Sequence, residues 1–242
     1  MSRNLPLPTR PPQAAPVTLL GTDEIDAMFT RLAAGNPLPR TELSYRDPFS
    51  LLVAVVLSAQ ATDVGVNKVT KSLFAAAPTP AAMVALGEEG VRAHIKTIGL
   101  YRNKARNVVA LSRLLLERHG GQVPAKRAAL EALPGVGGKT ASVVLNEAFG
   151  EATIAVDTHV FRVANRTGLA PGRTPAAVEA ALLLVVPERF RRGAHHWLIL
   201  HGRYVCLARR PNCPACTLRG ICRYPDKTTA AAAKPRRVQS GS

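Results

Sequence analysis

The chain has 242 residues, of which 47% are hydrophobic, so it is long and apolar enough to bury one or two cores and is not an intrinsically disordered protein. Its 32 Lys and Arg against 16 Asp and Glu give a net charge of +16, which favours a polyanionic partner such as nucleic acid over a generic basic surface. No apolar run approaches the ~20 residues of a membrane span, and no signal peptide is recognisable. We therefore expect a cytoplasmic protein that does not enter a membrane.

The first third of the chain predicts a tail and three helices. Residues 1–20 are rich in proline and lack periodicity, which indicates a disordered tail. Thr22 is expected to cap a helix that runs to Ala34. Asp47-Pro48 opens an apolar helix that continues to Gln60, and Asp63 is expected to cap the helix over 63–77. Gln60 thus lies at a helix end, where its amide can reach outward or simply meet solvent.

Two short helices follow, around residues 79–85 and 88–95. Gly99 then makes a turn, Leu100 is expected to be exposed on it, and Tyr101 begins a long helix to about His119. Arg102, Lys104 and Arg106 crowd the start of that helix, either as a solvated face or as phosphate contacts.

The chain shows no alternation of apolar and polar residues of the kind that marks a half-buried strand. The best strand candidate is TIAVD, residues 153–157, only five residues long. We predict an all-α fold.

A Gly-rich turn interrupts two helical stretches at residues 126–149. Neither a P-loop nor a dinucleotide fingerprint fits, because Leu133 and Thr140 stand where those motifs need glycine. Pro134 ends the first helix, and two glycines let a phosphate approach the backbone and the free N–H groups of the second helix. This pattern predicts a helix–hairpin–helix with DNA contacts, the alternative being a plain helix connection. The predicted contacts are Gly135, Val136 and Gly137.

Lys139 lies at the positive end of the second helix. The helix dipole disfavours an ammonium there, and partial burial would add to the effect, so its pKa is expected to be lowered. A neutral lysine amine forms Schiff bases with carbonyl-level carbons. A lysine that only binds phosphate is the alternative.

Asp157 follows TIAV and precedes the helix THVFRVANRTG. It is a candidate helix cap, and a carboxylate aimed at Lys139 is compatible with that role. Such a carboxylate accepts protons and stabilises positive charge that develops on a sugar. His159, two residues on, either contacts a DNA backbone or packs.

All four cysteines fall within 17 residues, with the spacing Cys206-x6-Cys213-x2-Cys216-x5-Cys222. In an intracellular protein this clustering indicates a metal site and not disulfides. By spacing alone, an iron–sulfur cluster and zinc are equally well supported. The same loop is basic and is expected to contact phosphates, a redox role being the alternative. Its predicted DNA contacts are Arg203, Arg209 and Arg210.

The motifs LPGVGGKTASVV, TIAVDTHVFRV, LSAQATD, IKTIGLY and HHWLILHGRY, together with the cysteine spacing, resemble the endonuclease III family of DNA glycosylase/AP lyases. The resemblance covers about residues 23–224. It implies that Lys139 is the Schiff-base nucleophile, that Asp157 is the essential carboxylate and that the four cysteines hold a [4Fe–4S] cluster. It also implies that Gln60 fills the gap left by an extruded nucleotide and that Leu100 wedges into the opposite strand.

The family fold implies two helical domains with the active site between them. Residues 41–151 would form one domain, residues 21–40 and 152–225 a discontinuous cluster domain, and residues 226–242 a disordered basic tail. The implied substrate is duplex DNA with damaged pyrimidines or abasic sites, bound by a monomer. Gly138 departs from the family pattern, because many relatives carry a basic residue there.

Three other classes account for only part of the pattern. A non-catalytic DNA-binding module would not need Lys139 and Asp157 together. An adenine-specific mismatch glycosylase typically lacks this lysine and has a further C-terminal domain. An electron-transfer protein would explain the cysteines but not the hairpin.

Overall fold

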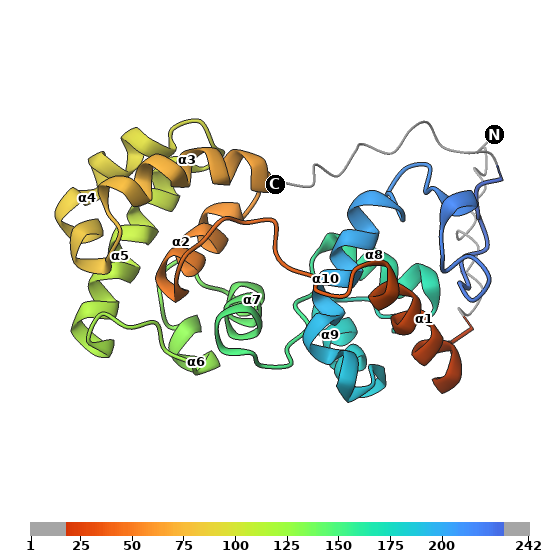
Figure 1. Ribbon diagram of the computed structural model, residues 1–242. Coiled ribbons are helices and arrows are strands. Elements are labelled where there is room, and N and C mark those ends of the chain that lie inside the picture. Colours follow the sequence, from red (N-terminus) through yellow and green to blue (C-terminus); the bar gives the residue numbers. More distant parts are fainter. Residues whose placement is uncertain (1–17, 230–242) are drawn as a thin grey trace, which may run out of the picture.

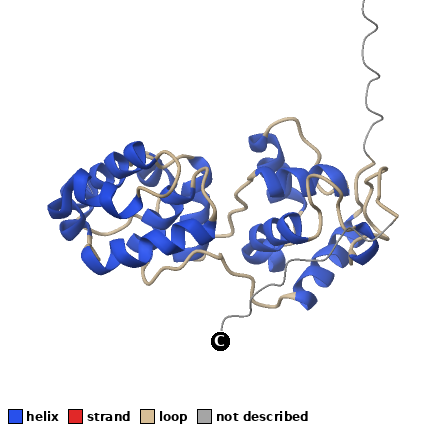
Figure 2. Cartoon of the chain, turned by 90° about the horizontal axis from the view of Figure 1, so that it is seen from above, coloured by secondary structure: helices blue, strands red, loops and turns tan. Residues whose placement is uncertain are grey.

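The computed structural model describes residues 18–229, and this part of the chain is helical without any strand, so the predicted all-α fold is confirmed (Figures 1 and 2). The elements are α1 Thr22–Gly35, α2 Pro48–Ser58, α3 Asp63–Ala76, α4 Pro80–Ile95, α5 Tyr101–His119, α6 Arg127–Glu131, α7 Gly138–Phe149, α8 Thr158–Thr167, α9 Pro175–Val185, α10 Glu188–Tyr204 and the 3-10 turn Cys213–Ala215.

The helices pack into two halves, each around its own hydrophobic core (Figure 1). Helices α2–α7 enclose one core, and α1 joins α8–α10 around the other. The two halves are connected by the segment after α1 and by the extended segment that leads from α7 to α8. A helix from the start of the chain therefore completes a core built mainly from its end.

Helix α2 is the centre of the first core because its residues from Phe49 to Leu57 are all buried. Asp47 caps it by accepting from the Ser50 N–H at 2.7 Å, and Pro48 occupies the first turn, where no backbone donor is lost. Helices α3, α5 and α7 pack around it. Because α7 packs on α2 and α6 packs on α7, this core fixes the position of the turn between α6 and α7.

Several local predictions were wrong in detail. The cap of α1 is Gly21, whose N–H donates to Glu24, and not Thr22. Thr62 caps α3 through the Gly65 N–H, which leaves the carboxylate of Asp63 for another partner. Residues 153–157 are extended but pair with no strand in the described chain. The two short helices expected around residues 79–85 and 88–95 are confirmed, because α4 consists of two helices that meet at a kink at Gly87, where φ is +70°.

The folded part reaches further at both ends than the composition indicated. Leu20 is buried and its N–H donates to the Gly168 carbonyl at 3.0 Å. Thr228 donates to the Pro211 carbonyl at 2.5 Å and accepts from the Cys213 N–H. The rest of both predicted tails lies outside the described residues. Within them, no single helix is both long and apolar enough to span a membrane, and only α3 and α4 taken together across their bend pass that test.

Candidate active site and metal centre

The hairpin between α6 and α7 is shaped by Gly135. Its φ is +81°, and a Cβ at this position would lie 2.8 Å from the Asn107 side-chain nitrogen. Only glycine fits a left-handed conformation against such a neighbour. Val136 is buried and anchors the turn in the core, whereas Gly137 faces open space at the start of α7. No side chain caps α7, so its first N–H groups remain available to an anion.

Lys139 is exposed in the first turn of α7, so the partial burial expected for it is not observed. Asp157 caps α8, where its Oδ1 accepts from the N–H groups of His159 and Val160, both at 2.8 Å. This cap uses one carboxylate oxygen and leaves the other for further partners. Asp157 can therefore cap α8 with one oxygen and face a substrate with the other.

The buried imidazole of His195 has its Nδ1 2.8 Å from the carbonyl oxygen of Ala155, two residues before Asp157. Burial lowers its pKa well below the usual range. The charge of Asp157 opposes this shift and the charge of Lys139 adds to it. Lys139 is on α7 and Asp157 caps α8, and these two helices belong to different cores. His195 opens the motif HHWLILHGRY, which was used only for the family resemblance, and no role was predicted for this histidine from the sequence.

Gln60 and Leu100 lie on two touching loops. Both are exposed and both adopt the left-handed conformation, with φ of 54° and 59°. A Cβ at Gly99 would lie 3.6 Å from the Gln60 carbonyl oxygen, so the two loops are neighbours. Non-glycine residues seldom adopt this conformation, and it is enriched where a side chain must be presented outward.

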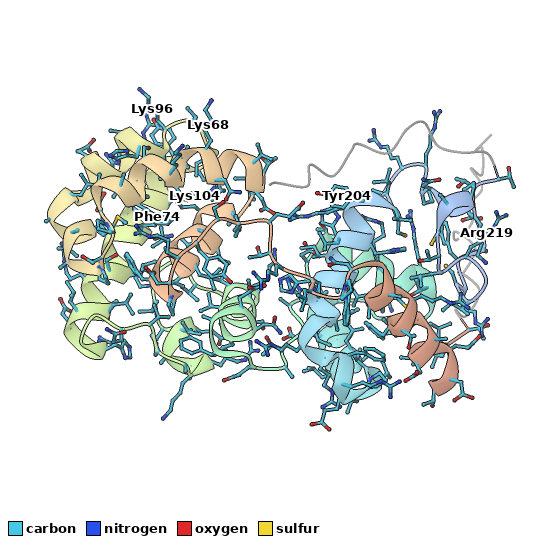
Figure 3. The ribbon with its side chains drawn as sticks, in the orientation of Figure 1. Lys68, Phe74, Lys96, Lys104, Tyr204 and Arg219 are labelled. Atoms are coloured by element: carbon cyan, nitrogen blue, oxygen red, sulfur yellow. The ribbon has the colours of Figure 1, made fainter. Side chains whose placement is uncertain are left out.

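Of the three cations at the start of α5, Arg102 and Arg106 are exposed but Lys104 is only 4% exposed, with no hydrogen-bond partner for its Nζ in the described chain. Lys104 lies inside its half of the molecule, unlike Lys68 and Lys96, which point outward (Figure 3). Burial lowers the pKa of Lys104. In this conformation Lys104 is not a phosphate contact.

The four cysteines line a single pocket beside α10. Yet no three His, Cys, Asp or Glu side chains in the described chain are gathered as one metal ion requires. A zinc ion would hold each cysteine sulfur about 2.3 Å from the metal. A polynuclear cluster spreads its cysteine ligands over several iron atoms and so holds them further apart. Four cysteines that line one pocket fit a metal centre. The set is Cys206, Cys213, Cys216 and Cys222.

Two arginines of α8 organise this cysteine loop. Arg166 donates to the carbonyls of Leu207 and Ala208 at 2.6 and 2.9 Å, and its Nη1 lies 3.7 Å from the Cys206 sulfur. Arg162 donates to the Cys206 carbonyl at 2.8 Å. The loop is thus held by charged hydrogen bonds from another helix. The sequence pattern alone does not show which groups these two arginines contact.

The remaining predicted DNA contacts divide into two groups. Arg209 and Arg210 are exposed on the cysteine loop. His159 is half-buried, and its Nδ1 lies 3.1 Å from Arg162 while its Cβ packs closely on Gly202, so it joins α8 to α10. Arg203, like His159, has partners within the protein, because it pairs with the carboxylates of Glu42 and Asp63.

The chain matches the family model for HhH-GPD superfamily base excision DNA repair proteins over residues 53–188. It is 60% identical to endonuclease III of Escherichia coli strain K12 over 200 residues, which cover 83% of this chain and 95% of that protein. The chain belongs to the endonuclease III family. Endonuclease III of Treponema pallidum is 58% identical, with coverage of 84% and 97%.

The structural comparison agrees with the family assignment. A trapped endonuclease III–DNA covalent intermediate superposes with a TM-score of 0.80 at 45% identity, covering 85% of this chain and 97% of that one. A thermostable thymine-DNA glycosylase gives a TM-score of 0.76 at 25% identity. The endonuclease III fold is therefore present over nearly the whole described chain.

Proposed function

We propose that this chain is a bifunctional DNA glycosylase/AP lyase of base excision repair that excises oxidised pyrimidines from duplex DNA. The observation that carries the proposal is the placement of Lys139. It is an exposed amine on the uncapped first turn of α7, and α10 is hydrogen-bonded both to α7, from Asn146 to the Arg192 carbonyl, and to the Ala155 carbonyl two residues before Asp157. The family relationship and the likeness to a covalent endonuclease III–DNA complex support it.

DNA binding would begin at phosphates. The open turn at Gly137 and the free N–H groups of α7 offer an anion site, and Arg209 and Arg210 add positive charge. The damaged nucleotide is turned out of the stack, since its sugar is out of reach inside a duplex. Gln60 fills the gap and Leu100 enters the opposite strand, which their shared outward presentation supports.

In the chemical step the amine of Lys139 attacks C1′ of the sugar, with Asp157 stabilising the positive charge that develops there. The C1′–N bond to Lys139 forms as the bond to the base breaks, and the base leaves with that electron pair and takes up a proton. The amine nitrogen then loses a proton and the C1′–O4′ bond breaks, with O4′ taking up a proton, so that the sugar ring opens and an iminium forms between C1′ and the lysine nitrogen. This iminium acidifies the C2′ proton. Loss of this proton expels the 3′ phosphate by β-elimination, which cuts the strand.

Cys206, Cys213, Cys216 and Cys222 would hold a [4Fe–4S] cluster, which supplies a structural link across the loop and possible redox chemistry when bound. Burial raises the pKa of the Cys216 thiol to about 11, and a bound metal cation would favour the thiolate that acts as a ligand. The protein is proposed to act as a monomer in the cytoplasm, where its DNA substrate lies.

Borohydride trapping on duplexes that contain an abasic site or thymine glycol tests the proposal. Borohydride reduces a Schiff base to a stable amine, so the wild-type chain is expected to form a covalent complex. Lys139→Gln is expected to form none. Lys126→Gln, an exposed lysine just before α6, is the matched control and should trap normally. Normal trapping by Lys139→Gln would refute the mechanism.

A further inference from the structure

Helix α10 carries two adjacent buried histidines, His195 and His196, each 3% exposed. Their rings meet edge to face, with centroids 4.9 Å apart. Polar side chains this deep are retained where they make specific bonds. The two rings reach in different directions, one toward the segment between α7 and α8 and the other toward α7 itself.

His195 holds the segment that leads to Asp157. Its Nδ1 lies 2.8 Å from the carbonyl oxygen of Ala155, a residue that is 1% exposed. A carbonyl only accepts, so Nδ1 carries the hydrogen. Burial keeps the ring neutral by lowering its pKa. The result is one fixed tautomer bonded to the backbone two residues before Asp157.

His196 holds the helix that carries Lys139. Its Nε2 lies 2.7 Å from Oε1 of Glu147, in the last turn of α7, although the N–H direction is not that of a well-formed hydrogen bond. Tyr45 and the Thr41 N–H also donate to Glu147, at 2.8 and 3.2 Å. Burial alone would raise the pKa of Glu147, but these partners outweigh it and lower it to about 2. Glu147 is therefore a carboxylate at neutral pH.

A third contact joins the same three elements. The side-chain nitrogen of Asn146, in α7, lies within hydrogen-bond distance of the carbonyls of Glu151, Thr153 and Arg192, at 3.0, 3.1 and 3.2 Å. Two of these carbonyls belong to the segment before Asp157 and the third to α10. Helix α10 is thus bonded both to the helix that bears Lys139 and to the segment that bears Asp157.

We propose that His195 is a positioning residue for Asp157, and that the His196–Glu147 pair braces α7 against the same helix, so that α10 sets the distance between Lys139 and Asp157. Neither histidine is assigned contact with the substrate. The inference rests on the proposed function, because it concerns the placement of the two groups that would perform the reaction.

The first test compares His195→Leu with His195→Asn in single-turnover excision of thymine glycol. Leucine cannot donate to Ala155, whereas the asparagine side-chain nitrogen can take the place of Nδ1. Since a misplacement of about 1 Å can cost on the order of 100-fold, we expect the leucine variant to be about 10- to 100-fold slower. Its DNA dissociation constant should stay within about threefold, and the asparagine variant should recover most of the rate.

Leu182→Ala, in the same core but on α9, controls for simple loss of stability. Its excision rate should be unchanged at a temperature where all variants are folded. A His195→Leu rate equal to wild type would overturn the proposal. So would an asparagine variant that is as slow as the leucine variant.

A double-mutant cycle separates positioning of Asp157 from general support of the fold. In an Asp157→Asn background, with abasic DNA and borohydride, adding His195→Leu should change the trapping rate by less than about twofold. A loss as large as in the wild-type background would overturn the proposal. If the wild-type chain itself failed to trap, the proposed function would fail, whereas normal wild-type trapping with an unaffected His195→Leu variant would sink this inference alone.

A measurement on the unmodified protein covers the case in which the leucine variant does not fold. Nitrogen-15 NMR of the histidine rings should show one neutral ring with its hydrogen on Nδ1 between pH 6 and 8, which His195→Asn removes. A His195 ring that titrates in that range, or that carries its hydrogen on Nε2, would contradict the proposed bond to Ala155.

Discussion

Arg203, near the end of α10, donates to Oδ2 of Asp63 at 2.5 Å, across 140 positions of sequence. The same guanidinium pairs with Glu42, which also accepts from Tyr204. Asp63 and Arg203 are 13% and 26% exposed, so the pair is largely screened from water. Arg203 was predicted to contact DNA and Asp63 to cap α3. The structure instead pairs them with each other, so that α10 is tied to the start of α3.

Arg203→Ala is therefore expected to affect stability more than DNA binding. Removing the guanidinium leaves two carboxylates near each other with no cation, which should cost about 1–3 kcal/mol in the free energy of unfolding, measured with urea. The slope of log DNA affinity against log salt should be unchanged. Arg209→Ala, at an exposed loop position, is the counterpart, because losing one phosphate contact should reduce that slope by about 1 without loss of stability. A reduced slope for Arg203→Ala would show that it does contact phosphate.

The hairpin glycines are expected to fail in different ways. Gly135→Ala forces a Cβ into a left-handed residue and against Asn107, so its unfolding free energy should fall by roughly 1–3 kcal/mol. Gly137→Ala meets open space at φ −99° and should fold normally. Its new methyl group lies where a phosphate would approach, so DNA binding should weaken. Thermal unfolding and a binding titration for both variants check this, and strong DNA binding by Gly137→Ala would argue against a phosphate at that turn.

Acid should destabilise the protein in a window set by His195. Its pKa is lowered on folding, so the unfolded chain binds more protons than the folded one as pH falls below the ordinary value of about 6.5. The stability that depends on the neutral ring is fully present above that pH and is lost progressively below it. Glu147 affects stability over a lower pH range. Its contribution is fully present above pH 4.5 and is lost only as the pH falls toward about 2. Urea unfolding between pH 8 and 5 should show a loss that is smaller in His195→Asn, and identical pH profiles for the two proteins would contradict it.

The cysteine loop should depend on iron. Purified protein is expected to be yellow-brown, with about four iron and four sulfide per chain, as a [4Fe–4S] cluster requires. Cys213→Ser should lose most of the colour and unfold at a lower temperature, because the loop that carries Arg209 is no longer closed by metal. Elemental analysis decides the point, since a colourless protein that contains one zinc ion would refute the cluster.

Much of the local structure could be read from the chain because it depends on neighbours in sequence. Helix α2 begins at Pro48 because Asp47 caps it, and α5 begins at Tyr101 after the turn at Gly99, as predicted. The cap of α3 was misplaced by one residue, since Thr62 and Asp63 are both good caps and only packing decides between them. Residues 153–157 have strand propensity, but they meet no partner strand in the described part of the chain.

The site shows the same division. The amino-acid sequence by itself determined the helical class, the hairpin turn, the pairing of Lys139 with Asp157 as candidates and the four-cysteine set, because each is a short pattern of residue types. The tertiary structure was needed to show that Arg203 is bound by carboxylates and that Lys104 is buried. It was also needed to show that His195 and His196 connect α10 to Ala155 and Glu147, on the segments that carry Asp157 and Lys139. The hydrogen bonds and ion pairs among these contacts join positions about 40 to 160 residues apart, and their partners follow from how the helices pack and not from any spacing along the chain.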